Sequence, residues 1–224
     1  MHELLDEIVG GQYAPGARLP SEDGMSRERN ANKTRVRAAV EDLRKVGILD
    51  VRHGVGQFVR PVDDWNVLDA AVVSAILAVR RLDLVREIID CQAVLEPPAA
   101  ALAAERATDE SAAGLVDRHK AVVDAAGRTR RRGLGLDDPV VQAEIEFHKA
   151  LAGMTANRPL QRMLTPVTTA IALTRHELAP GDDKALIRAL RRTVKAIEAR
   201  DGAAARKSVE ARVAAARRWL KRAG

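Results

Sequence analysis

The chain has 224 residues and a formal net charge of +6, with 46% hydrophobic, 30% charged and only 2% aromatic residues. This composition is that of an ordinary globular protein with a buried core, rich in strong helix formers and compatible with a polyanionic partner. The only cysteine, Cys91, excludes an intramolecular disulfide. The longest apolar run, residues 68–79, is too short to span a bilayer. No secretory signal is evident, so we expect a cytoplasmic protein with no membrane partner.

Glycine is concentrated in the first sixty residues, which also contain Pro15 and Pro20, and the pattern breaks near Pro61. We therefore expect two domains, residues 1–61 and 62–224. In the first domain the sequence predicts a short helix over residues 3–9. A second helix, capped by Ser21, follows to about Arg29, and a third, capped by Asn32, extends to Val46. A β-hairpin with a glycine-bearing tip is predicted from strands at 48–51 and 57–59.

From residue 64 onward, apolar residues recur at helical spacing, with turn residues between the periodic segments. We count about six helices, enough for an all-α antiparallel bundle. An arginine-rich segment between Arg128 and Gly135 is expected to be a mobile loop. The predicted fold class is therefore mainly α, with three helices and a hairpin followed by a helical bundle.

Two helices followed by a hairpin with a glycine-bearing tip are typical of a winged helix-turn-helix, whose second helix reads the major groove. At the start of that helix, Lys33, Thr34 and Arg37 lie on the polar side, opposite Val36 and Val40. Arginine and lysine suit guanine, and flanking arginines, including Arg29, would bind phosphates. The residues expected to contact DNA are Ser21, Arg27, Asn32, Lys33, Thr34, Arg35, Arg37, Arg52, His53 and Gly54.

Other interpretations remain open at this stage. The cations of the third helix could form a solvated surface, or the protein could coat DNA without sequence preference. The second possibility is suggested by basic C-terminal helices whose arginines are expected to be exposed, namely Arg188, Arg191, Arg192, Arg206, Arg217 and Arg218. An enzyme is not expected, because the sequence contains no glycine-rich phosphate motif and no His-Glu-x-x-His pattern. Glu144 and His148 form the only acid–base pair that stands out.

Four motifs in the first domain together resemble the GntR family of bacterial regulators. They are Pro15-Gly-Ala-Arg-Leu-Pro-Ser-Glu22, Thr34-Arg-Val-Arg37, Leu43-Arg-Lys-Val-Gly-Ile-Leu49 and His53-Gly-Val-Gly-Gln-Phe-Val59. In the second domain, Asp64-Trp-Asn-Val-Leu68, Leu95-Glu-Pro97, Ala103-Ala-Glu-Arg-Ala-Thr108 and Glu144-Ile-Glu-Phe-His-Lys-Ala-Leu151 resemble the helical FCD effector domain of the FadR-like branch. The resemblance implies a homodimeric repressor on a palindromic double-stranded operator, controlled by a small-molecule effector.

The DNA-reading segment departs from the family pattern at four positions. Asp23 stands where the family usually has arginine or another long polar residue, and Lys33 stands where arginine is usual. Arg35 replaces a common proline, and Arg29 replaces an apolar residue. We therefore expect an operator that differs from the typical one.

The resemblance also implies a divalent metal such as zinc, held by an aspartate and three histidines. Glu144 and His148 occupy two of these positions, but Leu190 and Arg212 stand at the other two and cannot bind a cation. The site is therefore expected to be incomplete, unless His119 or His176 substitutes from a neighbouring helix.

Arg212 suggests another kind of pocket, because a buried arginine is costly unless it is paired. One hypothesis is that Arg212, with Glu144 and His148 nearby, anchors an organic acid or another anionic metabolite without metal. The alternative is an internal salt bridge between Arg212 and Glu144. The predicted effector pocket consists of Gln92, Glu144, His148, His176 and Arg212.

Overall fold

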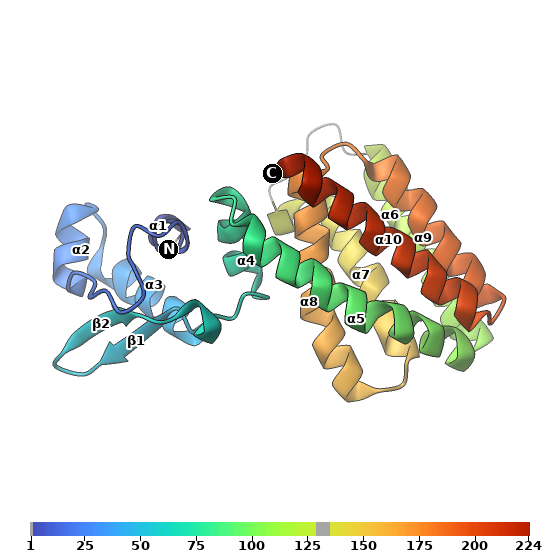
Figure 1. Cartoon of the computed structure of the whole chain (residues 1–224), viewed down its shortest axis with the longest axis horizontal. Helices are drawn as coiled ribbons and strands as arrows, with labels where there is room; N and C mark the ends of the chain where they lie inside the picture. The colour runs from blue at the N-terminus through green and yellow to red at the C-terminus, as the bar shows by residue number, and fades with distance from the viewer. Residues whose placement is uncertain (1, 129–134) are drawn as a thin grey trace. The chain divides into compact units, whose positions relative to one another are not determined.

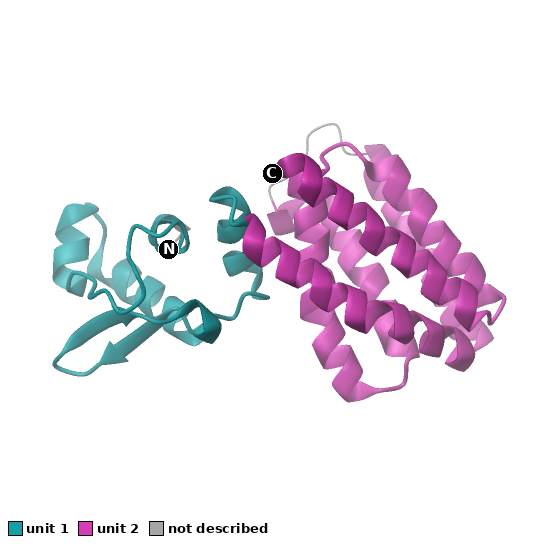
Figure 2. Cartoon of the chain, viewed as in Figure 1, with its two compact units in different colours: residues 1–81 teal, residues 82–224 magenta. Residues whose placement is uncertain are grey.

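The computed structural model describes residues 2–128 and 135–224, and residues 129–134 of the predicted arginine-rich loop lie outside the described residues. The chain forms two compact units, Met1–Arg81 and Leu82–Gly224 (Figures 1 and 2). The structure thus groups residues 62–81 with the N-terminal unit, whereas composition placed a boundary after residue 61.

The N-terminal unit contains four α-helices, a hairpin and a 3-10 turn in the described residues, in the order α1 (His2–Val9), α2 (Glu22–Glu28), α3 (Lys33–Lys45), β1 (Leu49–Arg52), β2 (Gly56–Val59), η1 (Val62–Asp64) and α4 (Ala70–Ala78). Both predicted N-caps are confirmed. The Ser21 side chain accepts a hydrogen bond from the backbone N–H of Gly24 at 3.1 Å, and Asn32 accepts one from Thr34 at 2.7 Å. These bonds satisfy backbone donors that a helix cannot pair internally, so they fix where α2 and α3 begin.

The hairpin is antiparallel, with Leu49 opposite Val59 and Arg52 opposite Gly56. Gly56 has a φ of +140°, and a Cβ at this position would lie 2.7 Å from Nε of Arg18. The backbone conformation therefore disfavours a side chain at Gly56, and the Arg18 guanidinium would have to move to make room for one. Strand β2, the second strand of the hairpin, begins at this glycine.

The C-terminal unit consists of six α-helices in the described residues, namely α5 (Leu82–Arg106), α6 (Asp109–Arg128), α7 (Pro139–Met154), α8 (Arg158–Leu178), α9 (Asp183–Glu198) and α10 (Gly202–Ala223), with a 3-10 turn η2 (Gly135–Asp137) before α7. Helix α5 continues through Pro97 and Pro98 and packs against α7, α8, α9 and α10 (Figure 1). Buried apolar residues such as Ile88, Phe147 and Ile197 fill the interior. The expectation of a mainly α fold with a winged helix-turn-helix and a helical bundle is confirmed.

None of the helices within residues 2–128 and 135–224 combines the length and the apolar composition that crossing a membrane requires.

Candidate functional site

The first turns of α3 present a polar surface to solvent. Lys33, Thr34, Arg35 and Arg37 are exposed, while Val36 on the opposite side is buried. All residues that the sequence predicted to contact DNA are solvent-accessible, a set comprising Ser21, Arg27, Asn32, Lys33, Thr34, Arg35, Arg37, Arg52, His53 and Gly54. The helix therefore has the division of faces that a major-groove reader needs, with a buried apolar side and exposed cations near its N-terminus.

Lys33 is engaged by an acidic neighbour on α2. Its Nζ atom lies 2.8 Å from a carboxylate oxygen of Asp23, and both side chains are largely exposed. The hydrogen bond from Lys33 lowers the pKa of the Asp23 carboxyl below its ordinary value of 3.8, so this group is negatively charged at neutral pH. The candidate DNA-reading surface thus contains a negative charge beside one of its cations.

Arg29 has a different environment from the one expected. Its guanidinium donates to both carboxylate oxygens of Glu7, at 3.1 Å for Nη1, and the hydrogen bonds to Glu7 raise its pKa. This half-buried pair joins α2 to α1. Arg29 therefore has a structural role in place of the expected phosphate contact.

The tip of the hairpin is also exposed and basic. The Arg52 guanidinium lies 4.8 Å above the centre of the Phe58 ring, and its Nε donates to Asp50 at 2.7 Å. His53 and Gly54 form the exposed tip, with Gly54 in the left-handed region at φ +71°. Stacking on Phe58 orients the arginine, as expected for a wing that contacts an adjacent groove.

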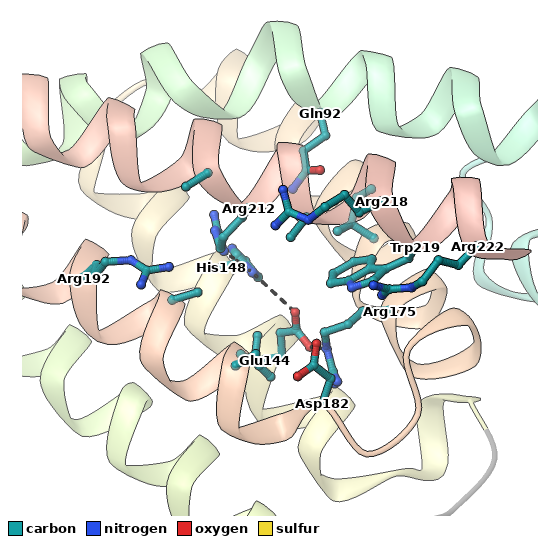
Figure 3. Close-up of a pocket in the computed structure, with 16 residues that line it drawn as sticks. Gln92, Glu144, His148, Arg175, Asp182, Arg192, Arg212, Arg218, Trp219 and Arg222 are labelled. Carbon is teal, nitrogen blue, oxygen red and sulfur yellow. Dashed lines mark hydrogen bonds and ion pairs between the residues drawn. The ribbon is translucent and has the colours of Figure 1, made fainter.

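A second candidate site is a cavity of about 340 Å³ in the C-terminal unit, lined by residues of α5, α7, α8, α9 and α10 and the turn before α9 (Figure 3). The structure brings four of the predicted pocket residues together here, namely Gln92, Glu144, His148 and Arg212. His176 does not line the cavity, and its Nδ1 atom lies 3.8 Å from the Asp138 carboxylate that caps α7.

Arg212 is buried, with 8% of its surface exposed, but its carboxylate partner is not the expected one. Its Nη2 atom donates to Glu96 of α5, and its Nη1 atom lies 3.0 Å from Nε2 of His148. The alternative of an internal salt bridge between Arg212 and Glu144 is therefore wrong in its partner, which is Glu96. Burial alone would raise the pKa of Glu96, but the charge of Arg212 and the contact with His148 outweigh burial, and the pKa lies well below its usual range.

Glu144 instead pairs with Arg175 of α8, which is 2% exposed. Nε of Arg175 donates to Glu144 at 2.7 Å, and Nη1 donates to Asp183 at 3.3 Å. Burial would lower the pKa of Arg175, but the two carboxylates raise it. The cavity is therefore built on two buried carboxylate–arginine pairs, and sequence reasoning identified only one member of each. Glu96 lay unrecognised inside the Leu95-Glu-Pro97 motif.

The residues present do not fit a divalent metal. An arginine cannot accept a hydrogen bond, so Nε2 of His148 must accept from Arg212, and its lone pair is not available to a cation. The positively charged guanidinium of Arg212 also contacts His148 and Glu96, whose side chains would otherwise be available as metal ligands, and it would repel a cation there. Neither of the possible substitutes reaches the cavity, since His119 contacts the backbone oxygen of Ile187 and His176 contacts Asp138. Across the part of the chain that the structure describes, no group of three or more metal-ligating side chains is assembled.

Four further residues of the cavity were not recognised as part of a site from the sequence, namely Arg192, Arg218, Trp219 and Arg222. Arg192 and Arg218 were expected on an exposed basic surface. They are exposed, but they also line the cavity (Figure 3). The sequence signal that could have indicated this part of the site is the four-residue spacing of Arg218 and Arg222, which places both arginines on one face of the helix, next to Trp219.

A winged helix-turn-helix with an exposed reading helix, together with a helical bundle that encloses a polar cavity, defines a DNA-binding transcriptional regulator. Residues 1–59 match the family model described as bacterial regulatory proteins of the gntR family, and residues 87–215 match the FCD domain. The chain therefore belongs to the GntR family of bacterial regulators and carries an FCD domain.

Its relatives are consistent with this assignment. The chain is 31% identical to an uncharacterized HTH-type transcriptional regulator of Mycobacterium tuberculosis, over 93% of this chain and 82% of that protein. It is 26% identical to the galactonate operon transcriptional repressor of Escherichia coli, over 97% and 93% of the two chains. Among solved structures, Lar, which controls expression of the Listeria monocytogenes agr system, has the same fold with a TM-score of 0.69, at 16% identity over 98% and 94% of the chains. The protein is a transcriptional regulator.

Proposed function

We propose that the protein is a metabolite-responsive repressor that binds a palindromic operator as a homodimer and senses an organic acid or another anionic metabolite in the cavity. The observation that carries this proposal is the cavity wall, on which the described residues place five arginines and only two carboxylates, those of Glu144 and Asp182. The chain has both parts that a ligand-controlled repressor needs, a DNA-reading unit and an FCD domain that encloses a cavity. The similarity to the galactonate operon repressor supports the proposal, since galactonate is an organic acid.

A footprinting experiment on the promoter of the protein's own gene tests the proposal. We expect protection of two half-sites at a fixed spacing, and release of the protected fragment by at least one member of an organic-acid panel. Binding that never discriminates between sequences at physiological salt would instead identify a DNA-coating protein, whose cations would include the exposed arginines of α9 and α10. A specific footprint that no metabolite alters would contradict the sensing role.

The homodimer can be tested at an exposed apolar surface. Val94 on α5 is 72% exposed and Met163 on α8 is 53% exposed, and these two helices pack against each other. We assign both side chains to the contact with a second copy of the chain, because the packing of α5 against α8 brings the two helices that carry them together. We expect Val94→Glu and Met163→Glu to give monomers by light scattering after size exclusion. Val123→Glu, at a 39% exposed position on α6, is the control that should remain dimeric. Dimers in all three variants would place the interface elsewhere.

Asp23 provides a prediction for DNA binding. Replacing Asp23 with asparagine removes a negative charge from the reading surface and releases Lys33 for phosphate contact. We expect binding to DNA to become severalfold tighter. We also expect the logarithm of the binding constant to fall more steeply with the logarithm of the salt concentration, by the amount that about one additional phosphate contact gives. Fluorescence anisotropy at a series of KCl concentrations measures both quantities. Glu28→Gln, at an exposed position on the same helix, is the control. Unchanged affinity and slope in Asp23→Asn would show that Asp23 lies away from DNA.

A further inference from the structure

The positive charge of the chain is concentrated in its last two helices. Residues 183–224, which contain α9 and α10, include 13 lysines and arginines but only four aspartates and glutamates. Their net charge is +9, whereas the net charge of the whole chain is +6. The N-terminal unit contains 12 basic and 12 acidic residues and therefore has no net charge. The excess positive charge thus lies in the C-terminal unit and not in the unit that carries the reading helix.

Helix α9 presents a row of cations to solvent. Arg188, Arg191 and Lys195 are exposed, while Leu190 on the opposite side is fully buried. Their spacings of three and four residues place these cations on one face of the helix. Helix α10 packs beside α9 and adds further exposed cations (Figure 1). Seven exposed cations of the two helices lie outside the cavity and have no ion-pair partner in the described residues. We call them the basic surface, which consists of Lys184, Arg188, Arg191, Lys195, Arg206, Lys207 and Lys221.

Elsewhere in the same unit, exposed lysines have carboxylate partners one helical turn away. Nζ of Lys120 on α6 lies 2.9 Å from Asp117, and Nζ of Lys149 on α7 lies 2.7 Å from Glu146. On the exposed face of α9 the neighbours at this spacing are other cations, and like charges in such positions destabilise a helix. The row on α9 therefore does not contribute to the stability of the fold.

The carboxylates near α9 and α10 do not neutralise the basic surface. Some of them already have a basic partner, since Asp183 pairs with Arg175, Asp90 with Arg217 and Asp109 with Arg200. The exposed carboxylates of α9, α10 and the turn between them are those of Glu198, Asp201 and Glu210, and Glu105 of α5 lies beside Gly202. These four carboxylates are fewer than the seven cations, so an excess of positive charge remains.

The basic surface combines charge with a lack of exposed apolar side chains. None of the large apolar side chains that are exposed in the described residues lies on α9 or α10. A protein partner usually requires apolar or aromatic side chains at the centre of an interface. A second copy of the chain would bring like charges together, which is unfavourable. Lysines and arginines alone are sufficient for a nucleic-acid backbone, because phosphates are bound mainly through charge.

The length of the row on α9 also suits a DNA backbone. Lys184 and Lys195 are separated by about 17 Å along the helix axis, since an α-helix rises about 1.5 Å per residue. Each strand of a DNA duplex carries one phosphate per roughly 3.4 Å of its axis, so a row of this length can meet several phosphates. Double-stranded DNA is also the polyanion that a GntR-family regulator binds.

We propose that the basic surface of α9 and α10 binds the phosphates of double-stranded DNA without reading its sequence, as a second DNA contact outside the winged helix-turn-helix. This inference goes beyond the proposed function, because it requires neither a metabolite nor a palindromic operator. The winged helix-turn-helix supplies the sequence preference, and the basic surface supplies affinity that decreases with salt.

The first test compares the reactivity of lysines in the full chain with and without a long duplex of random sequence at low salt. Limited acetylation followed by mass spectrometry measures the rate at each lysine. We expect Lys195 and Lys207 to react severalfold more slowly when DNA is bound. Lys120 and Lys149, on α6 and α7, are the internal controls and should react at unchanged rates. Equal rates at Lys195 and Lys207 with and without DNA, under conditions that protect Lys33, would overturn the inference.

A triple variant provides the second test. Arg188→Gln, Arg191→Gln and Lys195→Gln together should weaken binding to the operator and to random DNA by the same factor, about tenfold or more at low salt. The slope of the logarithm of the binding constant against the logarithm of the salt concentration should fall by about three, one unit for each lost phosphate contact. The three positions are exposed, so the variant should fold normally, which circular dichroism verifies.

The matched control removes the same amount of charge from other helices. Arg118→Gln, Lys149→Gln and Arg158→Gln change exposed positions on α6, α7 and α8, and together they should leave the affinity and the salt slope nearly unchanged. Equal effects of the two triple variants would show that only net charge matters, and would overturn the inference.

Polyglutamate serves as a probe for an acidic protein partner. If the triple variant on α9 lost binding to polyglutamate but kept the DNA affinity of the wild type, the basic surface would be a protein-binding site and the inference would be wrong. Failure of the proposed function gives a different result. Wild-type protein that binds operator and random DNA equally would contradict the proposed function, whereas protection of Lys195 and Lys207 would still support the basic surface.

Discussion

Replacing Glu96 with glutamine is expected to lower the free energy of unfolding by about 3–5 kcal/mol, because it leaves the buried Arg212 guanidinium without a counter-charge. Glu96 accepts hydrogen bonds from Arg212 and from Nε2 of Gln92, the latter at 2.7 Å, and its side chain is only 3% exposed. Glutamine keeps the size of the side chain but removes its charge. Urea denaturation of the full chain, monitored by circular dichroism, measures the loss.

The same two helices supply a matched control. Asp90 of α5 accepts a hydrogen bond from Arg217 of α10 at 2.9 Å, but both side chains are more than half exposed. Asp90→Asn should therefore cost no more than about 1 kcal/mol, since solvent screens an exposed pair. The double variant Glu96→Gln with Arg212→Met should recover much of the stability, because no charge is then left buried. If Glu96→Gln and Asp90→Asn lowered the free energy of unfolding equally, the buried ion pair of Glu96 would contribute no more to stability than the exposed pair of Asp90.

The pH dependence of this effect follows from the pKa of Glu96. The folded state holds this pKa well below the ordinary value of 4.5, so ionised Glu96 stabilises the fold at neutral pH. This contribution is fully present above pH 4.5 and is lost as the pH falls toward the folded-state pKa. The difference in unfolding free energy between wild type and Glu96→Gln should therefore shrink steadily below pH 4.5. A difference that stays constant with pH would contradict the assignment of the charge to Glu96.

Arg37→Ala is expected to weaken operator binding by about 1–3 kcal/mol, which corresponds to roughly 5- to 150-fold. Arg37 is exposed on the turn of α3 that carries the other candidate base contacts, and a bidentate contact with guanine would be lost. The loss should be larger for the operator than for random DNA, and fluorescence anisotropy on both fragments tests this difference.

The control for Arg37→Ala lies on the same helix. Arg44 is exposed near the C-terminal end of α3 and donates to Glu41 at 2.8 Å through its Nε atom. Arg44→Ala should change operator affinity by less than Arg37→Ala, since the N-terminal part of a reading helix enters the groove. Equal losses on operator and random DNA for Arg37→Ala would reassign Arg37 to a phosphate contact. Larger losses for Arg44→Ala would show that α3 does not enter the groove by its N-terminus.

The sequence was sufficient where local chemistry determines the structure. Ser21 and Asn32 cap their helices through their own side chains, and the hairpin follows from strand residues around glycines, so these elements were predicted correctly. Helix α4 was not predicted, because its residues are almost uniformly apolar and buried on several sides, and a helix of this kind shows no 3.6-residue periodicity.

The partners inside the cavity could not be predicted for a different reason. Glu96, Glu144, Arg175 and Arg212 lie on four different helices, and which acid meets which arginine depends on how the helices pack. Helical spacing predicted correctly that Glu144 and His148 share a face of α7. It could not predict that Arg175, and not Arg212, would pair with Glu144. The available signal for Arg175 was its position four residues after Ile171, which places it on the apolar face of α8.

Helix α5 begins at Leu82, the first residue of the C-terminal unit, and carries both Gln92 and Glu96. A ligand that draws Arg212 toward itself competes with Glu96 for the same guanidinium, and so acts directly on the helix that follows the DNA-binding unit in the chain. Any coupling of this kind is reciprocal by thermodynamic linkage. If the metabolite weakens operator binding by a given factor, operator DNA must weaken metabolite binding by the same factor. With such coupling, the affinity of the cavity for its metabolite would depend on whether the protein is bound to its operator.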